Sequence, residues 1–240
     1  LVPALVDLFE HLRQVPLPPI GQVVGRTGES GGYGGFDGYG GFGGFDGQGR
    51  ASDVTWRAHL LNFDGDGDER RPSSWYDEIA RVPGARPAFD LGRRNLADLD
   101  LDSSTVPRSL IHADLIHRNV LVNSASVAFG GGQLEANAEG SANITGVFDW
   151  GCGRFGDHLY EVCWFEFWAP WHPNLDVDLL MSALRSRWEA VGAMPVDERR
   201  RREACLLSIG LDHVVYNATV GEWDDLVAVI DRMSGLGLLG

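Results

Sequence analysis

The sequence contains no lysine, since all 20 of its basic residues are arginine. Chemistry that requires a lysine amine therefore cannot be done by these 240 residues alone. Cysteine is also scarce: Cys152, Cys163 and Cys205 are widely spaced and form no CxxC pair. This pattern argues against a disulfide framework or a zinc site and predicts reduced thiols. Cys163 and Cys205 lie in apolar runs and are expected to be core residues.

Long apolar runs are missing as well. No stretch of about 18 apolar residues occurs, so no transmembrane helix is predicted. The first residues, LVPALVDLFEHLRQ, have no basic region and carry acids early, which is unlike a signal peptide. We therefore predict a cytoplasmic protein that does not bind membranes. The chain does not start with methionine, and we expect it to begin inside a longer reading frame.

Positive charge is in short supply, because 34 acidic residues outnumber the 20 arginines and give a formal net charge of −14. Nucleic acids and anionic membranes are poor partners for such a surface, whereas a cationic small molecule would be attracted. The alternative interpretation is that the acidity only aids solubility.

Glycine, in contrast, is abundant and concentrated in residues 21–49, which contain an imperfect repeat of GGYGGFDG. A segment of this composition cannot pack a core and is predicted to be a long loop. Residues 38–43 fit the G-x-G-x-x-G pattern of nucleotide-binding loops. We give the match little weight, because no strand precedes it, no helix follows it, and glycine-rich sequence produces it by chance.

Apolar periodicity predicts helices before and after a short β region, within a single domain that spans residues 1–240. We expect Ser52 or Asp53 to cap the second helix, and Ser73 or Ser74 to cap the third. The helix that starts at Asp157 is apolar on nearly all sides and should be buried. The predicted helices cover residues 2–15, 56–61, 75–82, 93–99, 157–171, 176–191, 196–217 and 222–234.

The β region lies between residues 109 and 150, where short β-branched runs occur. NVLVN (119–123) and ITGVFDW (144–150) are expected to pair as a hairpin. The residues between them, 124–142, are too many for an ordinary hairpin loop, so we interpret them as a surface insertion. The predicted fold class is α+β, mostly α, with one small hairpin.

The stretch from His112 to Asp149 carries a pattern typical of phosphoryl transfer. Such a reaction needs a carboxylate that orients the acceptor hydroxyl and accepts its proton, together with oxygen ligands for Mg²⁺. His112, Asp114 and Asn119 have the H-x-D-x-x-x-x-N spacing of a kinase catalytic loop. Asp149 ends the second hairpin strand, where it can be directed back toward Asn119.

Residues 112–122, HADLIHRNVLV, resemble the H-G-D-x-x-x-x-N-x-L-V motif of aminoglycoside phosphotransferases. Residues 144–162 resemble the I-D-W-x-x-x-x-x-G-D-x-x-x-D/E segment of the same family. The resemblance extends over roughly residues 105–235, and more loosely over 1–62. It implies a protein-kinase-like C-terminal lobe whose N-terminal lobe is missing from this chain. Ala113 stands where that family usually has glycine, a mild change unless φ is positive.

The resemblance also implies site residues. Asp114 matches the catalytic base, Asn119 and Asp149 match the Mg²⁺ ligands, His112 matches the histidine that holds the catalytic loop, and Asp157 matches the aspartate that supports it. From the residues themselves, Glu161, Glu166 and Trp168 are candidates for a substrate pocket, in which the two glutamates could attract a substrate ammonium or could simply be solvated. For the aromatic stripe around Trp168, the alternative is a core role, which is the commoner case for such a stripe.

The implied activity is transfer of phosphate from ATP or GTP, with Mg²⁺, to a hydroxyl of a small, cationic, aminocyclitol-like molecule. Such kinases include enzymes of antibiotic resistance. The missing lobe would come from a longer reading frame or from another chain. Two alternatives remain: a truncated or degenerate lobe that binds a ligand or partner without catalysis, and a metal-dependent hydrolase that uses the same acids.

Overall fold

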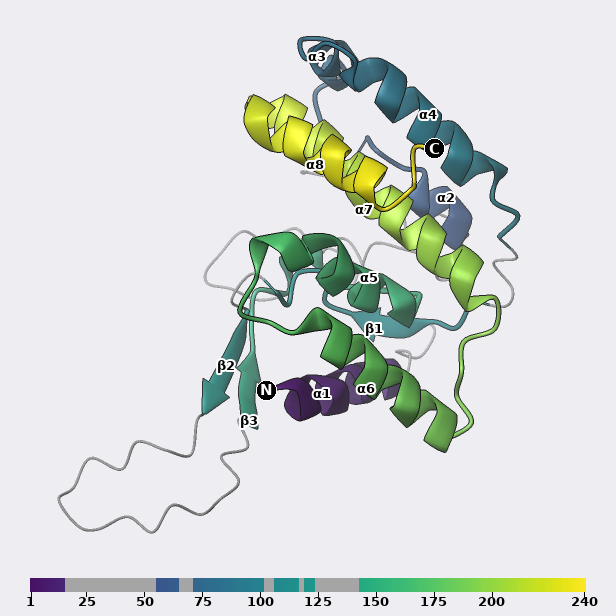
Figure 1. Cartoon of the computed structure of the whole chain (residues 1–240), viewed down its shortest axis with the longest axis vertical. Helices are drawn as coiled ribbons and strands as arrows, with labels where there is room; N and C mark the ends of the chain where they lie inside the picture. Colours follow the sequence, from purple (N-terminus) through teal and green to yellow (C-terminus); the bar gives the residue numbers. More distant parts are fainter. Residues whose placement is uncertain (16–54, 65–70, 102–105, 117–118, 124–142) are drawn as a thin grey trace, which may run out of the picture.

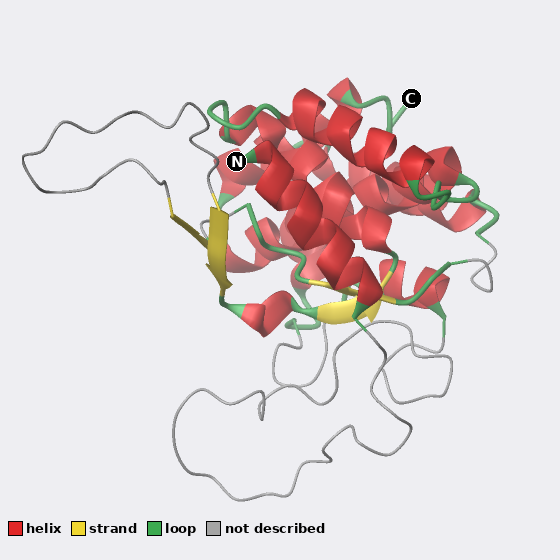
Figure 2. Cartoon of the chain, turned by 90° about the horizontal axis from the view of Figure 1, so that it is seen from below, coloured by secondary structure: helices red, strands yellow, loops and turns green. Residues whose placement is uncertain are grey.

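A computed structural model describes residues 1–15, 55–64, 71–101, 106–116, 119–123 and 143–240. The predicted glycine-rich loop 21–49 and the predicted insertion 124–142 lie outside these residues. Within the described part of the chain, no helix is both long enough and apolar enough to span a bilayer. The described residues form a mass of helices with two small antiparallel sheets at its margin (Figures 1 and 2). The predicted α+β, mostly α fold is therefore confirmed.

The described helices agree closely with the predicted ranges, with differences of a few residues at their ends. The main exception is the fourth helix, which begins eight residues before its predicted start at Arg93. The elements, in chain order, are α1 (Val2–Gln14), α2 (Trp56–Leu60), α3 (Trp75–Ile79), α4 (Ala85–Asp98), β1 (Ser109–Ile111), β2 (Val120–Asn123), β3 (Asn143–Val147), η3 (Trp150–Cys152), β4 (Arg154–Gly156), α5 (His158–Trp168), η4 (Ala169–Trp171), α6 (Val177–Ala190), α7 (Glu198–Val220) and α8 (Trp223–Gly235).

Side-chain caps fix where several helices start. Asp157 and Asp176 cap α5 and α6 by accepting hydrogen bonds from the backbone N–H groups of Leu159 and Leu179. The predicted cap of α2 is wrong: Thr55 has that position and accepts from the N–H of Ala58. Ser74 precedes α3 as predicted, but its side chain makes no capping hydrogen bond.

The two sheets bring distant parts of the chain together. β2 pairs with β3 in antiparallel register, with Val120 opposite Val147, which confirms the predicted hairpin. β1 pairs with β4, which was not predicted, and Ser109 lies opposite Gly156. This pairing connects the strand before His112 to the strand before α5. The candidate catalytic loop and the start of α5 are therefore neighbours in space.

Helix α5 lies between two apolar clusters, with its surroundings visible in Figure 1. One face of α5, including Leu159 and Phe165, packs with α1 and α6. The opposite face, including Cys163 and Phe167, packs against α7. Burial on both faces explains why the helix is apolar nearly all round, as predicted. Cys163 and Cys205 are both fully buried, so their predicted core positions are also confirmed.

Gly156 provides a test of this packing. A Cβ atom at this position would lie 2.2 Å from the ring of Trp56, which is itself 1% exposed. We expect Gly156→Ala to lower the free energy of unfolding by about 1–3 kcal/mol, because the buried indole has little room to move. Urea denaturation measures this change. Gly235→Ala is the control, since a Cβ there meets nothing within 4 Å; equal stabilities of the two variants would contradict the prediction.

Candidate functional site

Asp114 and Asn119 are in direct contact at the end of β1. The side-chain amide of Asn119 donates to Oδ2 of Asp114 at 2.9 Å and to the Asp114 carbonyl oxygen at 2.8 Å. Asn119 is 6% exposed, whereas Asp114 remains partly open to solvent. The first of these hydrogen bonds orients the Asp114 carboxylate, and the second holds the Asn119 side chain against the Asp114 backbone. The spacing of five residues predicted from the sequence is therefore matched by a contact in the structure.

Asp149 is brought to the same place by the β2–β3 hairpin. The backbone N–H of Phe148 donates to the carbonyl oxygen of Asn119 at 3.1 Å, so Asp149 directly follows a residue that is bonded to Asn119, the other predicted metal ligand. Asp149 is exposed and has a left-handed backbone, with φ 59° and ψ 63°. Aspartate is among the few non-glycine residues that tolerate this conformation. The turn directs the chain away from the strand into η3.

His112 links the candidate catalytic loop to the Asp149 turn. Its ring is fully buried, and Nε2 lies 2.8 Å from the carbonyl oxygen of Phe148. The ring also packs against the indole of Trp150, with centroids 4.7 Å apart. Burial lowers the pKa of His112, which favours a neutral imidazole that donates from Nε2 to that carbonyl. This contact is consistent with the predicted role of His112 in holding the loop.

The backbone of Ala113 has a positive φ of 62°. Alanine in place of the family's glycine is therefore not the mild change that the sequence suggested. In this region the methyl group of alanine is strained, at a cost of about 1–2 kcal/mol, whereas glycine enters it freely. Ala113 is nevertheless 1% exposed and firmly held. Strain of this kind persists only when surrounding contacts enforce the conformation. The contacts that enforce it here come from Glu161.

Glu161 binds the backbone of the candidate catalytic loop. Its Oε2 accepts hydrogen bonds from the N–H of His112 at 2.6 Å and of Ala113 at 2.8 Å. The residue is 3% exposed, and burial raises its pKa to about 7, although the two N–H bonds oppose that rise. Glu161 thus occupies an interior position that differs from the predicted place in a substrate pocket. Its geometry is that of a residue that positions the loop.

Asp157 makes its contacts one turn earlier on the same helix. It is fully buried, caps α5, and receives two hydrogen bonds from the guanidinium of Arg201 at 2.7 Å and 2.6 Å. Arg201 belongs to α7, so the ion pair fastens the start of α5 to a second helix. Through α5, this pair supports the helix from which Glu161 reaches the catalytic loop.

The remaining predicted substrate residues lie farther along α5. Glu166 forms an ion pair with Arg202, including a bond of 2.6 Å from Nε. Trp168 is 9% exposed and packs edge-on against Trp171 and His213. These contacts fit the alternative core interpretation, and substrate contact by Glu166 or Trp168 stays a prediction.

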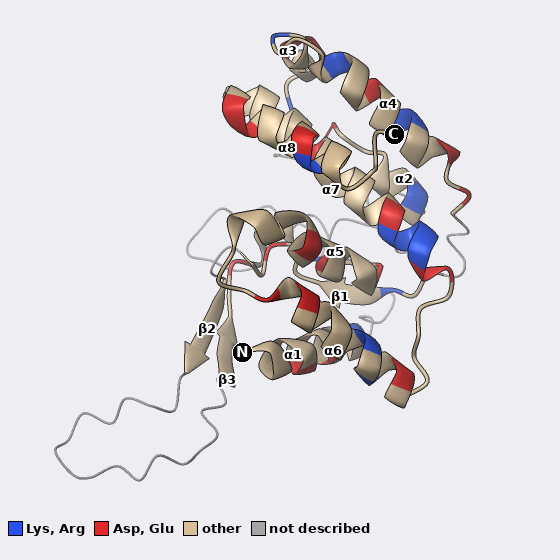
Figure 3. Ribbon diagram, in the orientation of Figure 1, with Lys and Arg blue, Asp and Glu red and all other residues tan. Residues whose placement is uncertain are grey.

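Arginines gather at the start of α7, as Figure 3 shows in blue. The contacts of these arginines explain why they gather there, because successive arginines bind different partners. Arg200 donates to the carbonyl oxygen of Asp100, Arg201 to Asp157, and Arg202 to Glu166. The arginine run therefore fastens α7 to surrounding elements. Arg201 was not singled out from the sequence, where nothing distinguishes it from its neighbours.

The donor atoms near Asp114 suit a hard cation. Because Asn119 gives its NH₂ group to Asp114, its amide oxygen is the end that could bind a metal, together with the carboxylate of Asp149. Mg²⁺ prefers such oxygen ligands and commonly uses one or two of them together with phosphate oxygens. Among the described residues, no group of three or more His, Cys, Asp and Glu side chains forms a metal site. The two oxygen donors of Asn119 and Asp149 fit Mg²⁺ that takes its other ligands from nucleotide phosphates and water.

Comparison with known proteins agrees with this geometry. No protein-family model matches the chain. The chain is 29% identical to hygromycin-B 4-O-kinase from Escherichia coli over 138 residues, which cover 55% of this chain and 33% of that kinase. The chain therefore matches only about a third of the length of this curated relative.

Solved structures of aminoglycoside phosphotransferase APH(4)-Ia have the same fold. One, a thermostable mutant with AMP-PNP and hygromycin B, has a TM-score of 0.57 and 23% identity, and the match covers 98% of this chain and 64% of that one. Another, with ADP and hygromycin B, has a TM-score of 0.59 and 22% identity and covers 100% and 65%. The partial coverage fits the C-terminal lobe. The predicted resemblance to the aminoglycoside phosphotransferases is confirmed, by a homologous sequence and by a shared fold over the C-terminal part of these kinases.

Proposed function

We propose that this chain is the catalytic lobe of a phosphotransferase that moves the γ-phosphoryl group of ATP to a hydroxyl of a small, cationic, aminocyclitol-like molecule. The observation that carries the proposal is the contact of Asn119 with the carboxylate of Asp114, at 2.9 Å, beside the turn that presents Asp149. The spacing alone is common in proteins. The contact joins a carboxylate to one predicted metal ligand, Asn119, and the hairpin brings the residue before the second, Asp149, to the Asn119 backbone. A carboxylate with two oxygen ligands for Mg²⁺ is the set of groups that phosphoryl transfer requires.

Asp114 is the group that we assign to the acceptor hydroxyl. One carboxylate oxygen, Oδ2, is engaged by Asn119, and the side chain is partly open to solvent, so a hydroxyl can approach it. Asp114 orients that hydroxyl and accepts its proton as the phosphoryl group transfers. The neutral His112 and the Glu161 bonds keep the loop, and therefore this carboxylate, in place.

Asn119 and Asp149 are the residues that would hold Mg²⁺. When bound, Mg²⁺ neutralises negative charge on the transferring phosphate. The Phe148 bond to the Asn119 carbonyl keeps the two ligands adjacent. Because the chain has no lysine, any lysine that pairs with the nucleotide phosphates must belong to a part of the protein outside these residues, in a longer reading frame or another chain.

The substrate class rests on charge and on the relatives. The formal net charge of −14 favours a cationic ligand over an anionic one. The curated relative is a hygromycin-B kinase, and the solved neighbours contain hygromycin B together with an adenine nucleotide or its analogue. An aminocyclitol antibiotic with several ammonium groups is therefore the first substrate to test, with ATP as donor and GTP as the alternative.

Binding of Mg·ATP, measured by calorimetry, tests the nucleotide part of the proposal. We expect the wild-type chain to bind, and Asp149→Asn to bind at least about tenfold more weakly, which equals 1.4 kcal/mol. Asparagine is preferred to alanine here because it tolerates the positive φ of this position. The matched control is Asp231→Asn, an exposed aspartate on α8, which should bind like the wild type.

Equal binding by the wild type and Asp149→Asn would contradict the assignment of Asp149. If the wild type does not bind Mg·ATP at all, the proposal fails for this chain, and the alternative of a degenerate lobe without catalysis is favoured. Catalysis that needs metal and no nucleotide would instead indicate the hydrolase alternative.

A further inference from the structure

The backbone on both sides of Asp114 is bonded to one buried carboxyl group. Oε2 of Glu161 accepts the N–H of His112 at 2.6 Å and that of Ala113 at 2.8 Å. The N–H of Leu115 contributes a further backbone hydrogen bond to the same carboxyl. Asp114 is the residue between these bonded groups, so Glu161 determines where the Asp114 backbone lies.

Ala113 is held in a backbone conformation that alanine avoids. Its φ is +62°, in the left-handed region that is unfavourable for a residue with a Cβ atom. A strained residue keeps such a conformation only while the surrounding contacts enforce it. We therefore expect any change that weakens the hydrogen bonds to Glu161 to release Ala113 and to shift the adjacent Asp114.

The strength of these hydrogen bonds depends on the charge of Glu161. A hydrogen bond to an ionised carboxylate is roughly twice as strong as one between neutral groups. Burial raises the pKa of Glu161 to about 7, although the hydrogen bonds from the loop oppose this rise, and the negative charge of Asp114 adds to it. The carboxyl group therefore changes its charge near neutral pH.

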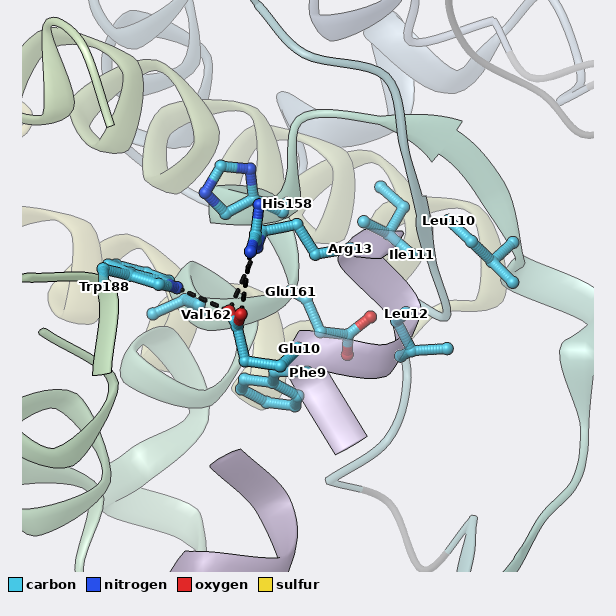
Figure 4. Close-up of a pocket in the computed structure, with 10 residues that line it drawn as sticks. All are labelled: Phe9, Glu10, Leu12, Arg13, Leu110, Ile111, His158, Glu161, Val162 and Trp188. Carbon is cyan, nitrogen blue, oxygen red and sulfur yellow. Dashed lines mark hydrogen bonds and ion pairs between the residues drawn. The ribbon is translucent and has the colours of Figure 1, made fainter. Parts of the chain in front are cut away.

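The elements that surround Glu161 add little charge of their own. Glu161 lines a small cavity between α1, β1, α5 and α6, which is drawn in Figure 4. The two charges that α1 brings to this cavity are paired with each other, since Glu10 binds Arg13 at 2.8 Å. Among the described residues that line the cavity, β1 and α6 contribute uncharged side chains, such as Trp188 of α6. The charges of α1 therefore balance beside Glu161.

The other ionisable neighbours keep one charge state near pH 7. On α5, Asp157 is paired with Arg201 of α7 at 2.6 Å. Burial lowers the pKa of His158 to about 4 and also lowers that of His112, so both rings are neutral. The ring of His158 also points away from the carboxyl of Glu161 (Figure 4). Glu161 is therefore the group at this place that gains or loses a proton near pH 7.

We propose that Glu161 and Ala113 form a pH-sensitive latch on the candidate catalytic loop: the ionised carboxyl of Glu161 holds Ala113 in its left-handed conformation and so places Asp114, and protonation of Glu161 releases both residues. The direction follows from the loop hydrogen bonds, which lower the pKa of Glu161 relative to the same buried site without them. By linkage, ionisation then favours the bonded loop, and protonation favours the released loop. The consequence for phosphoryl transfer rests on the proposed role of Asp114, whereas the latch itself is a property of the backbone.

The backbone amide resonances of His112 and Ala113, followed by NMR as a function of pH, test the latch without an activity assay. In the wild-type chain we expect both amides to shift together, with a midpoint near the pKa of about 7 of Glu161. Glu161→Gln keeps a neutral acceptor at the same place and should abolish this transition. The amide of Leu207, in the core of α7, is the control and should not shift in either protein.

Ala113→Gly separates the backbone strain from the charge, because glycine enters the left-handed region freely. In the wild type we expect the hydrogen-exchange protection factor of the His112 amide to be about tenfold lower at about pH 5.5 than at about pH 8, since protonation weakens the hydrogen bond and release also relieves the strain. In Ala113→Gly the same drop should be at most about threefold, because no strain remains to be relieved.

Each of these measurements has an outcome that contradicts the latch. A wild-type chain without the transition near pH 7, or a transition that persists in Glu161→Gln, would overturn it. Equal drops in protection in Ala113→Gly and in the wild type would overturn it as well, and this comparison decides the matter even if Glu161→Gln does not fold. Failure to bind Mg·ATP would instead overturn the proposed function and leave the latch standing.

Discussion

Replacing Asp114 with asparagine is expected to slow phosphoryl transfer to hygromycin B by about 10²–10⁴-fold, the range attributed to a positioned general base. The amide of asparagine cannot accept the hydroxyl proton. Its oxygen can still accept the hydrogen bond from the Asn119 side chain, which now ends on Oδ2 of Asp114. The loop geometry should therefore survive, and the loss should appear in kcat more than in KM. A coupled ATP-consumption assay measures both constants.

Two comparisons make the Asp114 result informative. Asp231→Asn changes an exposed aspartate by the same chemistry and should retain wild-type activity. Binding of Mg·ATP should be similar in Asp114→Asn and in the wild type, since Asn119 and Asp149 are the predicted metal ligands. Near-normal turnover by Asp114→Asn would refute the assignment of the base. Undetectable turnover by the wild-type chain would show that these residues alone do not form an active enzyme.

The parts of the fold predicted well are those specified by local sequence. The α6 helix begins after Asp176, whose side chain caps it, and the hairpin strands consist of β-branched runs. Asp114 and Asn119 were found together because they are only five positions apart in the sequence. Asp149 was placed with them by one further inference, that its strand pairs back onto the strand after Asn119.

The parts that sequence reasoning missed depend on contacts between distant elements. The positive φ of Ala113 is enforced by Glu161, 48 residues away, and no local pattern reveals it. Glu161 itself was expected either to attract a substrate ammonium or to be solvated, because a carboxylate is rarely buried. The one available signal was its position four residues after Asp157, on a helix that is apolar on nearly all sides. A charge on such a helix has to find a buried partner.

Loss of Arg201 should destabilise the fold more than loss of any exposed arginine. Arg201 is 3% exposed and is the bidentate partner of Asp157, which is fully buried. Arg201→Met leaves the carboxylate buried without its counter-charge, and breaking a buried pair in this way costs about 3–5 kcal/mol. Arg187→Met is the matched control, because its pair with Asp7 is about half exposed, and it should cost about 1 kcal/mol or less. Urea denaturation gives the unfolding free energies of both variants.

A second variant separates the missing charge from the lost packing. In Asp157→Asn combined with Arg201→Met, no uncompensated charge remains, and asparagine still caps α5 well. We expect the double variant to recover a large part of the stability that the single variant loses. A loss no greater than that of Arg187→Met, or no recovery in the double variant, would contradict the argument. Asp157 starts the helix that carries Glu161, and Glu161 binds the backbone N–H groups of His112 and Ala113. The single variant should therefore also loosen the backbone of these two residues. In this way the buried ion pair between Asp157 and Arg201 of α7 influences the position of the Asp114 carboxylate.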